Sequence, residues 1–292
     1  MNAFASGLAY VADRSLAQLI APFREARYRK RKAPFIFRGD RGLLFELYPG
    51  EEIDRHIATS GIYERRLLRY LDHVLPAGAV MLDVGANIGN HALYLARKCA
   101  AVHCFEPNPE TWRRLERNIA LNGATNVTVH RYGLGDRDCV APFRTNREGN
   151  LGASGFVAMG RPAETGGDLL ELPIRDADRV IDELQLSRLD LIKIDVEGME
   201  PQVLHALRRS IARYRPLVTF EYSGHLSGDE EWRTVRASLP GYTILAPRPA
   251  GESRKIGKML QLIRRGGFPE FAEVREPEPR WHECLIAFPV PR

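Results

Sequence analysis

The fold is decided by Val80-Met-Leu-Asp-Val-Gly-Ala-Asn-Ile-Gly89 and, one short segment later, Val102-His-Cys-Phe-Glu-Pro-Asn108. The first run is apolar and rich in β-favouring residues until Gly85 and Gly89 interrupt it, which is typical of a strand that enters a tight turn. Residues 91–98, HALYLARK, carry apolar side chains at helical spacing, and a second apolar run follows. The stretch therefore predicts one strand–turn–helix–strand unit with an acidic residue near the end of each strand.

The two acids indicate which ligand this unit would hold. A dinucleotide needs G-x-G-x-x-G, but Asn87 stands at the middle glycine position, and Asp83 would repel a pyrophosphate. S-adenosylmethionine (SAM) fits better, because its ammonium and sulfonium suit Asp83 and its carboxylate suits the free N–H groups of a helix N-terminus. Glu106, 17 residues after Gly89, is placed to accept both ribose hydroxyls. An alternative treats the acids as loop caps and the glycines as turn formers, but the presence of both acids favours SAM.

Composition narrows the class of protein. With 44% apolar and 27% charged residues, the 292-residue chain has the make-up of a soluble globular protein with one large domain, or a domain and an appendage. A net charge of +5 suits an anionic substrate or membrane surface but is too dilute for a nucleic-acid binder. The four cysteines lack metal-type spacing, so we expect free thiols. Without a signal peptide or an apolar span of membrane length, we expect a cytoplasmic protein.

Residues 1–75 are predicted to form an N-terminal cap, and residues 76–292 the catalytic domain. The cap is expected to contain a helix over residues 8–32, a hairpin of residues 35–37 and 43–47, and a helix over residues 64–75. The first helix is amphipathic and ends in a basic run. That pattern fits contact with an anionic membrane or a partner, and more often it marks a solvated helix end whose cations complement the helix dipole.

The rest of the chain alternates between strand and helix patterns. Strands are expected at residues 127–132, 140–145, 153–159, 169–174, 189–195, 216–221, 242–245 and 283–288, and helices at 111–122, 176–184, 201–214 and 229–239. Residues 140–145 and 153–159 are expected to pair as a hairpin, and residues 133–136 to form a turn. The glycine-rich residues 160–167 suggest a substrate lid, and residues 247–281 a long excursion between the last two strands.

Acidic residues recur where these strands end. In a doubly wound parallel sheet, ligands bind outside the carboxyl ends of the strands. Carboxylates gathered there suit a cationic cofactor, and their mutual repulsion can raise one pKa enough to create a base. We expect the earlier acids to face the cofactor, with one of them accepting from the adenine amino group, and the later acids to face the substrate. In chain order these acids are Asp83, Glu106, Asp136, Asp195, Glu197 and Glu221.

Several motifs resemble those of a known family in the same order. They are Asp83-Val-Gly-Ala-Asn-Ile-Gly89, Phe105-Glu-Pro-Asn-Pro109, Gly135-Asp136, Asn150-Leu-Gly-Ala-Ser154 and Ile192-Lys-Ile-Asp-Val-Glu-Gly-Met-Glu200. Together they resemble the FkbM family of SAM-dependent methyltransferases over roughly residues 63–222. The resemblance implies a class I, Rossmann-like α/β fold with strand order 3-2-1-4-5-7-6 and an antiparallel last strand. It also implies methylation mostly of hydroxyls on natural products and glycan sugars, and in a few members of peptide nitrogen.

Site residues follow from the acids and from this resemblance. For SAM they are Tyr63, Asp83, Gly85, Ala86, Asn87, Gly89, Glu106, Pro107, Asn108, Gly135, Asp136 and Asp195. The catalytic candidates are Asp195 or Glu197 as base, with Glu221 as alternative base or orienting group. We interpret Lys193 as a buried strand lysine, and His225 as a surface residue or a further base. No metal is required, although Asp195, Glu221 and a third ligand could hold Mg²⁺.

The predicted function is SAM-dependent O-methylation of a sugar, glycan or natural product. N-methylation of a peptide or small molecule, NAD(P)-dependent oxidoreduction and SAM binding without catalysis are the alternatives. After the strand at 189–195 the chain reads Asp-Val-Glu-Gly instead of the Pro-Pro-aromatic run that stacks a flipped base, so nucleic acid is not the expected acceptor. A homo-oligomer and peripheral membrane contact through the basic N-terminal helix are compatible with the sequence.

Overall fold

The computed structural model describes residues 19–146, 149–157, 167–223, 229–247, 271–276 and 281–291. The chain divides into two compact units. One comprises residues 1–73 and 247–272, and the other residues 74–246 and 273–292. The division of function predicted from the sequence, a cap over residues 1–75 and a catalytic domain over 76–292, stays a prediction.

The first unit contains the predicted hairpin. Strands β1 (Phe35–Arg38) and β2 (Leu44–Leu47) pair antiparallel around the short helix η1 (Asp40–Gly42). The predicted second helix is α3 (Arg65–Val74), and a helix absent from the prediction, α2 (Glu52–Ser60), precedes it. Gly61 ends α2 with a φ of 91°, a conformation that glycine adopts without strain.

The predicted N-terminal helix ends earlier than expected. Residues 19–29 are helical, so its end at residue 32 was wrong, and its predicted start lies outside the described residues. The chain leaves the helix in a turn closed by the Arg31 N–H, which donates to the Tyr28 carbonyl. In the part of the chain that the structure describes, we find no helix that is both long enough and apolar enough to span a membrane.

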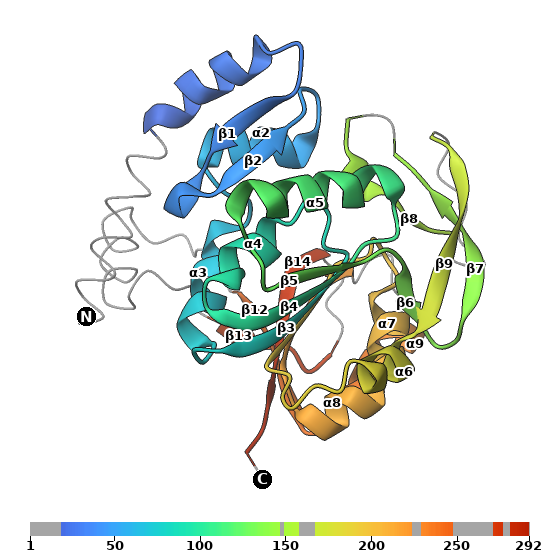
Figure 1. Cartoon of the computed structure of the whole chain (residues 1–292). Helices are drawn as coiled ribbons and strands as arrows, with labels where there is room; N and C mark the ends of the chain where they lie inside the picture. The colour runs from blue at the N-terminus through green and yellow to red at the C-terminus, as the bar shows by residue number, and fades with distance from the viewer. Residues whose placement is uncertain are drawn as a thin grey trace, which may run out of the picture. The chain divides into compact units, whose positions relative to one another are not determined.

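An eight-stranded sheet is the centre of the second unit (Figure 1). Its order is β13-β12-β14-β11-β10-β3-β4-β5. The strands are β3 (Ala79–Val84), β4 (Cys99–Phe105), β5 (Val127–His130), β10 (Leu191–Ile194), β11 (Leu217–Ser223), β12 (Tyr242–Pro247), β13 (Phe271–Glu273) and β14 (Trp281–Pro289). Strand β14 is antiparallel to both β11 and β12, whereas β11, β10, β3, β4 and β5 run parallel.

The predicted doubly wound α/β fold is confirmed by this sheet. Without β13, the seven remaining strands follow the order 3-2-1-4-5-7-6 when read from β5. Strand β13 lies within the predicted excursion at residues 247–281 and adds an eighth strand. Every residue of β3 and of β10 is buried, because helices cover both faces of the sheet.

Helices lie on both faces of the sheet (Figure 1). Helices α4 (Asn90–Ala96) and α5 (Pro109–Asn122) cover one face, and α6 (Ala177–Glu183), α7 (Glu200–Ala206), α8 (Arg208–Tyr214) and α9 (Asp229–Ser238) lie on the other. The single helix predicted over residues 201–214 is wrong, because α7 and α8 are separate. They meet at Leu207, and the buried Asp178 carboxylate caps α8 by accepting from the Arg209 and Ser210 N–H groups.

A smaller sheet with the order β6-β9-β7-β8 accounts for the irregular region. Its members are β6 (Gly133–Gly135), β7 (Cys139–Arg144), β8 (Gly155–Phe156), which follows the short helix η2 (Leu151–Ala153), and β9 (Leu169–Asp176). The predicted pairing of β7 with the following strand is confirmed, although β8 has only two residues. The turn predicted at residues 133–136 is wrong. Residues 133–135 form a strand parallel to β9. The predicted lid at residues 160–167 lies, except for Gly167, outside the described residues.

The expectation of free thiols is confirmed. None of the four cysteines, all of them in the described residues, forms a disulfide, and Cys99, Cys104 and Cys284 are buried. In this environment they act as small apolar side chains that fill the core.

Gly85 is the glycine on which the sheet edge depends most. Its φ is +77°, and a Cβ atom there would lie 1.8 Å from the Asp195 carbonyl oxygen. We expect Gly85→Ala to lower the free energy of unfolding by roughly 3 kcal/mol or more, because backbone strain and displacement of β10 add together. Gly78→Ala is the matched control, since Gly78 has a φ of +73° with nothing within 4 Å of its Cβ position. It should cost only about 1 kcal/mol in urea titrations, and equal losses would contradict the close-approach argument.

Candidate active site

The turn after β3 is shaped by three left-handed residues. Gly85, Asn87 and Gly89 have φ angles of 77°, 49° and 89°. Asparagine is among the few non-glycine residues that visit this region routinely, so Asn87 keeps the turn geometry while its side chain occupies the middle position. The Asn118 amide donates to the Ile88 carbonyl at 2.9 Å and fastens α5 to the turn.

Glu106 connects this turn to the end of β4. Its Oε2 accepts from the Asn87 N–H and its Oε1 from the Asn108 N–H, each at 3.0 Å. Asn108 in turn caps α5 by accepting from the Glu110 N–H. A carboxylate can accept about four hydrogen bonds, so Glu106 retains capacity for two hydroxyl donors. Burial, opposed by the two N–H groups, raises the pKa of Glu106 to about 7.

Asp83 is a buried carboxylate that lacks hydrogen-bond donors. It is 0% exposed, and neither carboxylate oxygen accepts a hydrogen bond within the described residues. The nearest charge is the Lys193 ammonium, 3.5 Å from Oδ1. Because buried carboxylates are normally hydrogen-bonded, Asp83 is suited to a ligand that brings a donor or positive charge.

Lys193, on β10, connects this strand to β3 and to the turn that follows β3. Its Nζ donates to the Gly85 carbonyl at 3.1 Å and lies 3.1 Å from Asp195 Oδ2. The predicted burial of this lysine is correct, but its interpretation as a strand residue alone missed the ion pairs. The spacing Lys-x-Asp was the available signal, because alternate residues of a strand point to the same face.

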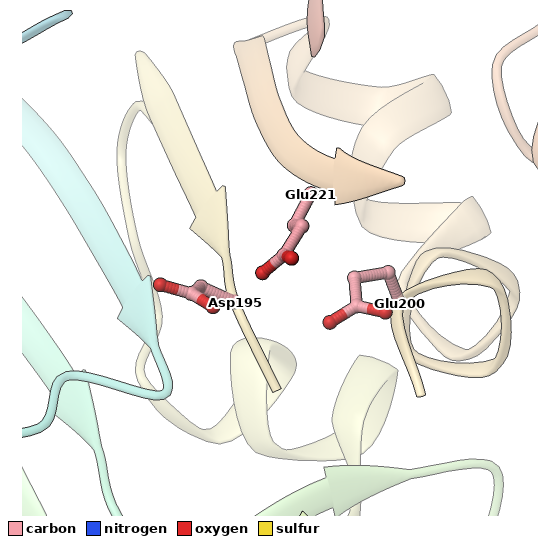
Figure 2. A group of neighbouring side chains, drawn as sticks. All are labelled: Asp195, Glu200 and Glu221. Carbon is pink, nitrogen blue, oxygen red and sulfur yellow. The ribbon is translucent and has the colours of Figure 1, made fainter. Parts of the chain in front are cut away.

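Three carboxylates gather near the carboxyl ends of β10 and β11. Figure 2 shows Asp195, Glu200 and Glu221 around one space, and ligand atoms from all three lie within 4.8 Å of one another. Burial would raise the pKa of Asp195, but the Lys193 ammonium has the largest of the opposing effects. Together with His91 and a hydrogen bond with Glu221, it holds the pKa of Asp195 below its usual value. Asp195 therefore remains anionic beside Lys193. His91, buried in α4, was not among the predicted site residues.

The loop after β10 is held by Glu200. The Glu200 carboxylate accepts from the Val196 N–H at 2.9 Å and from the Gly198 N–H at 3.2 and 3.1 Å. Burial raises the pKa of Glu200 in spite of these bonds. The sequence prediction assigned no role to Glu200, although an acid at the first residue of a helix is a known capping signal.

Glu197 lies within the loop that Glu200 holds. Its φ is 57°, which costs a glutamate conformational energy. The pKa of Glu197 is raised to about 9. Burial of the carboxyl group is the largest cause, and the negative charges of Asp195, Glu221 and Glu200 add to it. The residue as a whole is exposed to solvent, so water screens part of this repulsion.

The structure brings most of the predicted site residues to one edge of the sheet. Ion pairs and hydrogen bonds link the turn after β3 to Glu106 on one side and to Asp195 and Glu221 on the other. Pro107 and Asn108 follow Glu106, and Ala86 lies within the turn.

Other predicted residues are not brought into these contacts. Gly135 belongs to β6 in the small sheet, and Asp136, which follows it, is exposed. Tyr63 belongs to the first unit, where its ring lies 5.7 Å from the His56 ring. Cofactor roles for these three residues stay predictions, and His225 lies outside the described residues.

The acidic group also bears on the alternative metal site. Glu200 is the third carboxylate that a Mg²⁺ site with Asp195 and Glu221 would need. However, Glu200 already accepts from two backbone N–H groups, and Asp195 is already paired with Lys193. Hydrogen-bond donors and a cation of the protein thus already balance the negative charge of two of the three carboxylates. The expectation that the site holds no metal stays a prediction.

Comparison with known proteins identifies the family. Residues 83–269 match the methyltransferase FkbM domain. The chain belongs to the FkbM methyltransferase family. It is 28% identical over 148 residues to the hexuronic acid methyltransferase AglP of Haloferax volcanii, covering 51% of this chain and 58% of AglP. It is 26% identical over 186 residues to the 2-O-methyltransferase NoeI of Sinorhizobium fredii, covering 59% of this chain and 75% of NoeI.

Coverage limits what these relatives say about the FkbM-family chain as a whole. For three of the curated relatives that it matches, it spans only 10%, 59% and 58% of their length. A crystal structure of methyltransferase FkbM from Methylobacillus flagellatus has 21% sequence identity and a TM-score of 0.44, covering 78% of this chain and 47% of that one. The predicted family membership is confirmed.

The raised pKa of Glu106 predicts a pH dependence of stability. Without a ligand, the folded protein keeps a proton on Glu106 from its usual pKa of 4.5 up to about 7, whereas the unfolded chain has lost it. The free energy of unfolding should therefore fall by up to about 3 kcal/mol as pH rises through this window. Glu106→Gln should make that slope shallower in chemical denaturation between pH 4 and 8, and the slope that remains comes from other groups with a raised pKa, such as Glu197 and Glu200. Identical slopes for the two proteins would show that Glu106 does not titrate there.

Proposed function

We propose that this methyltransferase uses SAM to methylate a hydroxyl group on a sugar, glycan or natural-product acceptor. The observation that carries the proposal is the buried Asp83 carboxylate, which lacks hydrogen-bond donors and lies at the turn after β3. Glu106, one strand away, combines capacity for further donors with a position fixed by two backbone N–H groups.

The residues at this edge fit SAM group by group. Asp83 would accept from the ammonium, and the glycine turn at the start of α4 suits the carboxylate. Glu106 would accept from the ribose hydroxyls, and Asp136 from the adenine amino group. When bound, SAM supplies an electrophilic methyl group on a sulfonium. A nicotinamide dinucleotide fits less well, because its pyrophosphate would meet the Asn87 side chain and the negative charge of Asp83.

Proton removal from the acceptor is the chemical task of the later strands. A hydroxyl is a weak nucleophile while protonated, so a positioned base is required. We assign this role to Glu197, because its raised pKa makes its carboxylate the stronger base and its exposure leaves it reachable. Two neighbouring carboxylates would orient the acceptor, the anionic Asp195 and Glu221, which is hydrogen-bonded to Asp195. Their negative charge also helps to raise the pKa of Glu197.

The relatives favour a sugar hydroxyl over nitrogen. AglP is named for methylation of a hexuronic acid, and NoeI for methylation at a 2-O position. A nitrogen acceptor is the second candidate, because the acidic group formed by Asp195, Glu200 and Glu221 would also attract a protonated amine. The chemical bond in the labelled product, ether or amine, decides between them.

Ligand binding tests the cofactor. We expect isothermal titration to detect SAM and not NAD. Glu106→Ala should weaken SAM binding on the order of 100-fold, because two hydrogen bonds to a charged acceptor are lost, and Asp83→Asn by roughly tenfold or more. Glu171→Ala, which changes an exposed glutamate of β9, is the control and should leave affinity unchanged. NAD binding, or full SAM affinity in Glu106→Ala, would overturn the assignment.

Turnover tests the base. With SAM labelled in its methyl group and fractionated extract of the source cell as acceptor, Glu197→Gln should reduce transfer by about 10²–10⁴-fold and leave SAM affinity intact. The wild-type rate should rise with pH toward the raised pKa of Glu197, and the variant should lose that dependence. Glu171→Gln should retain full activity. Unchanged turnover in Glu197→Gln would refute the role of Glu197, and bound SAM that never loses its label to any fraction would indicate a binding module.

A further inference from the structure

The helix at residues 19–29 has two chemically distinct faces. Its inner face is anchored to the first unit by Tyr28, whose buried hydroxyl donates to the Tyr48 and Glu51 carbonyls and accepts from the Gly50 N–H. Arg24 lies on the same side, with its guanidinium 3.5 Å from the Thr59 carbonyl and 5.8 Å from the centre of the Phe37 ring.

The opposite face carries apolar side chains that are exposed. Leu19 and Phe23, one helical turn apart, are 71% and 79% exposed. At 100° per residue, Arg27 and Lys30 fall on this side of the helix and Tyr28 on the other. We call the exposed side the outer face, and it consists of Leu19, Pro22, Phe23, Ala26, Arg27 and Lys30, all of them exposed.

Charge is concentrated at the same place. Residues 24–32 contain six Lys and Arg and one acid, a net +5, which equals the net charge of the whole chain. The one acid, Glu25, is paired with Arg29 at 2.8 Å. The basic residues at 27, 29, 30, 31 and 32 are all exposed. The remainder of the chain is therefore close to neutral, and the positive charge lies beside the exposed Leu19 and Phe23.

We propose that the outer face binds an anionic lipid surface, with Leu19 and Phe23 inserted among the acyl chains and the basic residues against the headgroups. This is the physics of an interfacial amphipathic helix, in which apolar burial and electrostatic attraction act together. Anionic lipid supplies both the negative charge and the apolar layer that the face requires. A nucleic acid would satisfy the charge but leave the two apolar side chains in water.

The proposal is tested by co-sedimentation of the full chain with vesicles. Binding is expected to vesicles of phosphatidylcholine with 30% phosphatidylglycerol, to be weak on pure phosphatidylcholine, and to fall as salt is raised. Arg27→Gln, Lys30→Gln and Lys32→Gln together should lower the partition coefficient on the order of 100-fold. Leu19→Ser with Phe23→Ser should lower it by roughly tenfold or more at unchanged charge.

Matched variants elsewhere make the test specific. Arg117→Gln, Arg208→Gln and Arg233→Gln remove the same charge from exposed positions of the second unit, and Val140→Ser with Leu169→Ser removes exposed apolar side chains there. Both sets should retain binding, and every variant should retain SAM affinity.

Three results would overturn the proposal. One is equal loss of binding in the control and outer-face variants. Another is vesicle binding that survives Leu19→Ser with Phe23→Ser while those changes abolish a concentration-dependent dimer in sedimentation velocity, because the face would then join two copies. A third is a preference for RNA that only the charge variants lose.

Discussion

The buried ammonium of Lys193 is the interaction on which the candidate site depends. In the parallel register of β3 and β10, Lys193 lies opposite Asp83, and Asp195 projects from the same face of β10 two residues later. One cation thus lies between two carboxylates and also donates to the Gly85 carbonyl. Removing one partner of a buried ion pair typically costs 3–5 kcal/mol, because the other charge is left uncompensated. The same contact therefore supports the fold and fixes the turn that faces the cofactor.

The position of this single cation among several carboxylates also explains why the pKa values of those carboxylates differ. Asp195, nearest to Lys193, is held ionised, whereas burial and neighbouring carboxylates raise the pKa of Glu197. Glu106 is buried far enough to reach a pKa of about 7, yet its two backbone N–H donors keep that value from rising further. Separation of pKa values within one group of carboxylates is how a site assigns binding and proton transfer to different residues.

Much of this architecture was predictable because local sequence patterns determine it. The apolar runs of β3 and β10 and the turn glycines predicted the doubly wound sheet correctly. The assignment of its carboxyl edge to the cofactor stays a prediction. The predictions are wrong where contacts between residues far apart in the sequence determine the local structure. Asp178 splits the helix predicted over residues 201–214, and residues 133–135 pair with residues 174–176 of β9, which lie 41 positions later along the chain. The role of Glu200 was missed because its acceptors, the Val196 and Gly198 N–H groups, are exposed as donors only once the loop folds.

Glu200 shows how the fold positions a strained catalytic candidate. A glutamate in the left-handed region costs about 1–3 kcal/mol unless the surrounding structure determines that conformation. At Glu197 this determination comes from both sides. Glu200 binds the N–H groups of the residues before and after it, and Gly155 of β8 passes so close that a Cβ there would lie 3.3 Å from Glu197 Cβ. Because these contacts tie the loop to α7 and to the small sheet, two parts of the fold position the carboxylate assigned to the acceptor.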